Sequence, residues 1–162
     1  MHHVAIRTAD ILRAIAFYEI LGFTVTERFT AGMTLACWME GWNGRIELMQ
    51  VPNPTPPPDP FADEGYVGYY HLSLDLRHGP HDSREKSGEN GISVTLPQWL
   101  DRLQKDINDA SASQTGGVIL NPLTILLPPE QQMIGSQVYE VAFIADSDGL
   151  PIEVLNPLTP KN

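Results

Sequence analysis

Apolar and polar residues follow each other in an order that predicts the same series of secondary-structure elements twice. In the first half, a strand-like run is followed by apolar residues at helical spacing, between Asp10 as a good N-cap and Gly22 as a stop. Three further apolar runs follow this helix. The first half is therefore expected to form one strand, one helix and three strands, at residues 3–8, 11–21, 23–29, 33–39 and 45–51.

The second half repeats this order with additions. A strand is expected at residues 69–76, and Pro97 is expected to be the first residue of a helix. Three apolar runs again follow, at residues 118–127, 138–145 and 151–155, and residues 146–149 form the turn before the last run. Two tandem βαβββ units predict an α+β fold in which a curved, mixed β-sheet forms a cup.

The domain organisation follows from this repeat. Residues 1–162 are expected to form a single domain made of two βαβββ modules, 1–51 and 66–157. Residues 52–65 between them are rich in proline and are expected to be an extended linker. The polar residues 77–95 are expected to form an exposed insert in the second module.

Charge and cysteine content narrow the classes of partner. The formal net charge of −10 argues against binding to nucleic acid or to an anionic membrane surface. A single cysteine provides no disulfide framework and favours a reducing compartment. No run reaches the roughly 18–20 apolar residues that span a bilayer, and no signal-peptide pattern is visible. A soluble, cytoplasmic protein is expected.

Each half carries a histidine at its first strand and a glutamate in its last strand. His3 precedes Val-Ala-Ile and His71 precedes Leu-Ser-Leu, while Glu47 lies in Ile-Glu-Leu and Glu153 in Ile-Glu-Val. Such side chains are costly to bury at strand positions unless they are paired or bound to a metal. Two imidazoles and two carboxylates predict a site for a divalent Zn, Ni, Co, Fe or Mn ion with positions left open for substrate. In the alternative interpretation, the histidines cap strands and the glutamates are exposed at strand edges.

The sequence gives weaker support for metal binding by the other histidines. His2 is expected on the opposite face of the strand from His3, exposed to solvent. His78 and His81 lie in the polar insert with Asp82, where a second metal site is one alternative to a solvated surface.

The chain resembles the vicinal oxygen chelate superfamily over residues 3–23, 44–50, 70–75 and 139–155. This superfamily includes glyoxalase I, methylmalonyl-CoA epimerase, extradiol dioxygenases, fosfomycin-modifying enzymes and bleomycin resistance proteins. Bacterial-type glyoxalase I holds its metal with His, Glu, His and Glu, and the resemblance carries these roles to His3, Glu47, His71 and Glu153. Chains of this superfamily often pair, which leaves a homodimer open.

Three residues near these ligands are expected to contact the substrate: Arg7, Met49 and Ser73. Arg7 matches a basic residue that helps to hold the glutathione carboxylate in glyoxalase I, whereas Met49 and Val51 replace polar positions of that enzyme. Ser73 shares a strand face with His71. The resemblance therefore leaves glutathione binding open.

The resulting prediction is a metal-dependent, glyoxalase-like enzyme with a small-molecule substrate that chelates the metal through adjacent oxygens. Its chemistry is expected to be that of a lyase or isomerase, through a metal-stabilised enediolate with Glu153 or Glu47 as the base. One alternative is an extradiol-type Fe(II) dioxygenase, which needs two histidines and one carboxylate and would not require Glu47. Another is a metal-free binding or sequestration protein of the bleomycin resistance type.

Overall fold

The computed structural model describes residues 1–57, 59, 61–62, 65, 67–79, 94–113 and 117–158. Its first module consists of β1 (Val4–Thr8), α1 (Ile11–Ile20), β2 (Thr24–Ala31), β3 (Thr34–Gly41) and β4 (Gly44–Gln50). The helix begins where the sequence predicts, because the Asp10 carboxylate accepts the backbone N–H groups of Leu12 and Arg13. It ends before Gly22, whose φ of 97° suits glycine.

The second module consists of β5 (Leu72–Asp75), the short 3₁₀ helix η1 (Leu76–His78), α2 (Leu96–Ser113), β6 (Ile125–Ile134), β7 (Gln137–Ala145) and β8 (Pro151–Pro157). The strand predicted at residues 69–76 is shorter and begins after His71. The turn before β8 is confirmed, since Asp146 and Leu150 share a backbone hydrogen bond of 2.8 Å. Most of the polar insert, residues 80–93, lies outside the described residues, including His81 and Asp82.

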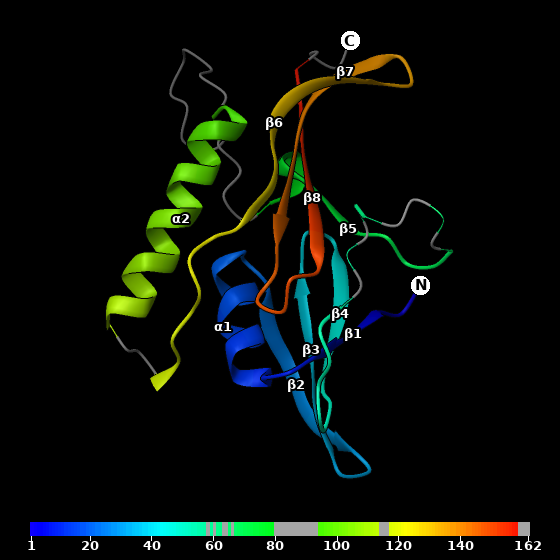
Figure 1. Ribbon diagram of the computed structural model, residues 1–162, viewed down its shortest axis with the longest axis vertical. Helices are drawn as coiled ribbons and strands as arrows, with labels where there is room; N and C mark the ends of the chain where they lie inside the picture. Colours follow the sequence, from blue (N-terminus) through cyan, green and yellow to red (C-terminus); the bar gives the residue numbers. More distant parts are fainter. Residues whose placement is uncertain are drawn as a thin grey trace.

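The two modules have the same strand order. The sheets run β1-β4-β3-β2 and β5-β8-β7-β6, and in each sheet the first strand of the module pairs in parallel with the last. The remaining neighbours pair antiparallel. Figure 1 shows the two curved sheets with α1 and α2 next to each other. The predicted α+β fold with two tandem βαβββ units is confirmed.

The strand predicted at residues 118–127 is wrong in position. The strand is β6, which begins at Ile125 and continues through Pro128 and Pro129. β6 is an edge strand with β7 as its neighbour, so a missing proline N–H costs no sheet hydrogen bond on the open side. The pairing also shifts register between Ile125 and Glu130. The apolar residues before β6 cover the core instead, and Leu120 is buried there.

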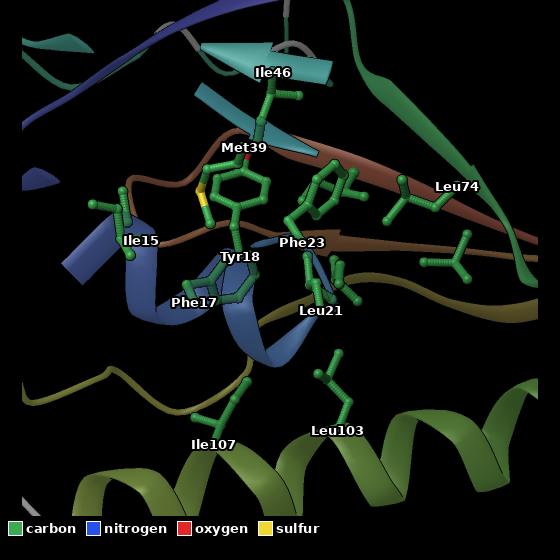
Figure 2. Packing of buried hydrophobic residues seen from close by; sticks show 14 of the residues in the cluster. Ile15, Phe17, Tyr18, Leu21, Phe23, Met39, Ile46, Leu74, Leu103 and Ile107 are labelled. Carbon is green, nitrogen blue, oxygen red and sulfur yellow. The ribbon is translucent and has the colours of Figure 1, made fainter. Parts of the chain in front are cut away.

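One hydrophobic core joins both modules. Figure 2 shows Leu103 and Ile107 of α2 directed toward the side chains of α1, whose other neighbours include Met39 and Ile46 of the first sheet. Core positions on a strand alternate with positions on the opposite face. Residues that alternate with core positions, Glu47 and Glu153 among them, are therefore directed to the other face of each sheet.

The turn between β7 and β8 also ties the modules together. Asp148 accepts hydrogen bonds from the Thr8 hydroxyl at 2.5 Å and from the Ala9 backbone N–H at 3.1 Å. The neighbouring Asp146 accepts the hydroxyl of Tyr18 on α1 at 3.0 Å, and both side chains are buried. The two carboxylates thus fix the start of the first module against the end of the second.

Candidate functional site

His3 and Glu47 form the first of two histidine–glutamate pairs. The two side chains come from neighbouring parallel strands, because Ala5 of β1 lies opposite Glu47 of β4 and His3 directly precedes β1. Their Nε2 and Oε2 atoms are 2.7 Å apart. Trp38 of β3 lies opposite Glu47 on its other side and donates its indole N–H to the same oxygen at 3.4 Å. The carboxylate is therefore held from both neighbouring strands.

His2 and Arg45 extend this first pair. His2 was expected on the opposite face from His3, but its Nδ1 lies 2.8 Å from Nδ1 of His3 and its ring packs edge-on against Trp38. Strand alternation fails here because both histidines precede β1. Arg45 of β4 places NH1 2.8 Å from His2 Nε2.

His71 and Glu153 form the second pair at the equivalent positions of the second module. His71 directly precedes β5, as His3 precedes β1, and its Nε2 is 3.4 Å from Oε2 of Glu153 on β8. Ser73 lies opposite Glu153 in the parallel register, and its hydroxyl donates to the same oxygen at 2.6 Å. Ser73, which is expected to contact substrate, therefore lies directly beside the glutamate.

Aromatic rings surround His71. Tyr70 and Phe143 contact the imidazole with ring centroids 4.7 Å and 5.1 Å away, and Phe61 of the linker packs against Phe143 at 5.5 Å. Nδ1 of His71 is buried and has no hydrogen-bond partner within the described part of the chain. A buried ring nitrogen without a partner carries a desolvation cost, which marks this imidazole as incompletely satisfied.

The four predicted ligands thus come together as two pairs. Among the described residues, no group of three or more His, Cys, Asp or Glu side chains is close enough to hold one metal ion. The expected convergence of all four within one chain is therefore not observed there. The nitrogen and oxygen donors suit a divalent cation in kind, and each pair can supply two ligands. A metal site with all four of these donors would need both pairs.

The predicted substrate contacts on the first sheet lie beside Glu47. Arg7 and Met49 are register partners on β1 and β4, two residues beyond Ala5 and Glu47, so they share the face of the glutamate. Arg7 is exposed and Met49 is half-buried. This places a guanidinium and an apolar side chain on one side of the first pair.

Several neighbours of the two pairs could not be assigned to them from the sequence. His2 and Trp38 are contacts of the first pair, and Tyr70 and Phe143 are contacts of the second. Trp38 could have been found from its place opposite Glu47 once the β3–β4 register was known. Tyr70 precedes its strand, where no periodic pattern gives its direction.

Known protein families and solved structures share the fold of this chain. The family model of the Glyoxalase/Bleomycin resistance protein/Dioxygenase superfamily matches residues 1–154. The chain belongs to this superfamily. No curated protein sequence matches the chain. Within the described residues, no helix of this superfamily member is long and apolar enough to cross a membrane.

Solved structures of the superfamily share this fold at low sequence identity. The glyoxalase family protein from Enterococcus faecalis has a TM-score of 0.59 and 18% identity, over 96% of this chain and 95% of that one. The glyoxalase family protein from Bacillus cereus has a TM-score of 0.57 and 16% identity, over 98% and 94%. A glyoxylase/bleomycin resistance protein/dioxygenase domain from Frankia sp. EAN1pec has a TM-score of 0.56 and 17% identity, over 99% and 93%.

Proposed function

We propose that this superfamily member is a metal-dependent enzyme acting on a small molecule with two adjacent oxygens, by lyase or isomerase chemistry. The observation that carries the proposal is the recurrence of the same histidine–glutamate pair in both modules. His3 with Glu47, and His71 with Glu153, occupy the same place relative to the first and last strand. Packing alone gives no reason for both sheets to carry this polar pair in the same position.

The four side chains would hold a divalent cation that stabilises negative charge on substrate oxygens as a Lewis acid. Glu153 is the proposed base, which removes a proton from the carbon next to a carbonyl and returns it to the neighbouring carbon. Its carboxylate is oriented for this role by the Ser73 hydroxyl. Glu47 is instead held by His3 and Trp38.

The residues beside Glu47 give the substrate its proposed contacts. Arg7 is exposed on the face of Glu47 and would bind a substrate carboxylate through its guanidinium. Met49, its register partner, would contact an apolar part of the substrate. These contacts suit a small organic acid or a thioester of one.

We further propose that a homodimer completes the centre, with the His3–Glu47 pair of one copy facing the His71–Glu153 pair of the other. Within the described part of one chain, these pairs do not form a group that could hold a metal. In a two-fold symmetric dimer each such combination would occur twice, because both copies contribute both surfaces.

A complementation experiment tests the shared centre. One variant, His3→Ala with Glu47→Ala, lacks the first pair, and a second, His71→Ala with Glu153→Ala, lacks the second pair. Each variant alone should bind no zinc or nickel. Refolding the two together should restore about a quarter of the wild-type metal content, because half of the dimers are mixed and each mixed dimer has one intact centre.

The outcomes separate the two parts of the proposal. If wild type binds metal and the mixture recovers none, the centre forms within one chain and the dimeric site is wrong. If dialysed wild-type protein binds no Zn, Ni, Co, Mn or Fe at up to about millimolar concentration and shows no thermal shift, the metal-dependent function is wrong.

The role of Glu153 as base predicts a specific kinetic defect. Glu153→Gln keeps a carbonyl oxygen near the Ser73 hydroxyl but loses basicity. The rate should fall by about 10²- to 10⁴-fold while metal content stays near wild type. Substrates to assay are the hemithioacetal of methylglyoxal and glutathione, then 2-oxo acids, 2-hydroxy acids and thioesters.

Glu47→Gln is the matched comparison for this experiment. Loss of turnover in Glu47→Gln, with Glu153→Gln near full activity, would move the base to Glu47. If neither variant slows turnover of a substrate that the wild type converts, proton abstraction by these glutamates is excluded.

A further inference from the structure

We propose that Arg45, acting through His2, determines which ring nitrogen of His3 carries its proton, so that Arg45 and His2 are positioning residues for the His3–Glu47 pair. The inference rests on the proposed function only where it concerns the effect on metal affinity. Its basis is a continuous series of short contacts from Arg45 through His2 and His3 to Glu47, on the face of the first sheet opposite the core.

Arg45 is the fixed donor at the start of this series. Its guanidinium donates to the Glu40 carboxylate through Nε at 2.8 Å and also through NH2, and it lies over the Trp38 ring at 5.4 Å from the centroid. These contacts hold NH1 2.8 Å from Nε2 of His2. An arginine side chain can only donate, so Nε2 of His2 must be the acceptor and carries no proton.

The remaining protons follow from this first assignment. A neutral His2 then carries its proton on Nδ1, which lies 2.8 Å from Nδ1 of His3 and donates to it. A neutral His3 must in turn carry its proton on Nε2, which donates to Glu47 Oε2 at 2.7 Å. The direction of every hydrogen bond from Arg45 to Glu47 is therefore determined.

This direction opposes the use of His3 as a metal ligand through Nε2. A ligating nitrogen must offer its lone pair, so the proton of His3 would have to move to Nδ1. Nδ1 of His2 would then become the acceptor, and a proton on His2 Nε2 would face the donor group of Arg45. One of the two contacts of His2, with Arg45 or with His3, must therefore be lost when His3 binds a metal through Nε2, and the series held by Arg45 weakens metal affinity.

The first test is made on the metal-free protein and needs no activity. Nitrogen-15 NMR at about pH 8.5, where free imidazole is neutral, should find His2 protonated at Nδ1 and His3 protonated at Nε2. A scalar coupling between the two Nδ1 atoms should be detectable across their hydrogen bond. In Arg45→Met, His2 should lose its fixed Nδ1–H form, and His2→Phe, which keeps an aromatic ring against Trp38, should remove the coupling.

The second test measures zinc and nickel affinity by calorimetry. Arg45→Met should bind metal up to about tenfold more tightly than wild type, the size expected for releasing one hydrogen bond. Arg28→Met is the control, because it removes the same charge from an exposed position on β2 of the same sheet. The gain should persist at about 1 M salt, where the Debye length is about 3 Å and a charge effect would be screened.

The tautomers of His2 and His3 test the role of Arg45 independently of the proposed function. A His2 protonated at Nε2, or the same His2 and His3 tautomers in wild type and Arg45→Met, would overturn it. So would a gain in affinity that Arg28→Met matches or that salt abolishes. If wild type binds no metal, the proposed function fails, and the spectra of the metal-free protein alone decide whether Arg45 sets the tautomer of His3.

Discussion

At the scale of single residues, two aspartates have pKa values shifted in opposite directions. Burial raises the pKa of Asp146, and this outweighs the backbone N–H groups of Leu150 and Asp148, which act to lower it. Partial burial also acts to raise the pKa of Asp75, but hydrogen bonds from Arg77 outweigh it, so the pKa is lowered. The two carboxylates therefore contribute to the pH dependence of stability with opposite signs.

The signs give a prediction for unfolding at different pH values. At Asp146 the folded protein binds more protons than the unfolded one, so its contribution to the free energy of unfolding decreases as pH rises from about 4 through the raised pKa. At Asp75 the contribution is present above about 4 and is lost as pH falls through the lowered pKa. Asp146→Asn should reduce the loss of stability as pH rises, and Asp75→Asn should reduce the loss of stability as pH falls.

Urea denaturation between about pH 3 and 7 measures both slopes. Asp101→Asn, at an exposed position of α2, controls for the loss of one carboxylate. A stability profile of Asp146→Asn that is parallel to wild type across this range would contradict the assigned direction.

The four side chains of the two histidine–glutamate pairs could be singled out from the sequence, but their surroundings could not. His3, Glu47, His71 and Glu153 occur in two similar strand sequences, and the structure does form a pair in each module. The direction of His2 depends on backbone outside a strand, where alternation gives no information. Its contacts with His3 therefore follow only from the three-dimensional structure.

At the scale of elements, α1 was predicted almost to the residue because its signals are local. Asp10 as N-cap and Gly22 beyond the end are read directly from the sequence. β6 was misplaced because two signals compete: its prolines argue against a strand, while the apolar residues before it resemble one. Only its place at the sheet edge makes the prolines acceptable, and that place depends on tertiary structure.

The N-cap of α1 predicts a measurable loss of stability. Asp10→Ala removes the acceptor for the N–H groups of Leu12 and Arg13 and should lower the free energy of unfolding by about 1 kcal/mol. Asp10→Ser keeps a side-chain acceptor at the cap and should retain most of that stability. Urea denaturation measures the difference, and an equal loss in both variants would assign the effect to something other than the cap.

At the scale of the whole molecule, the sequence repeat predicted the two modules but not their relative placement. Their packing depends on the contact of α1 with α2 and on Asp148, which binds Thr8 from the far end of the chain. Such contacts between residues distant in sequence have no periodic signature. The expected meeting of His3, Glu47, His71 and Glu153 also depends on this placement, and among the described residues they form two separate pairs.

The buried thiol of Cys37 makes local opening of the core measurable by chemical labelling. Cys37 is the single cysteine of the sequence, it lies in the common core with 1% of its surface exposed, and burial raises its pKa. The reactive thiolate is therefore scarce, and a thiol-modifying reagent can reach it only when the core around β3 opens. The rate at which this thiol is labelled therefore reports how often the core opens around the sheet that carries Glu47 and pairs it with His3.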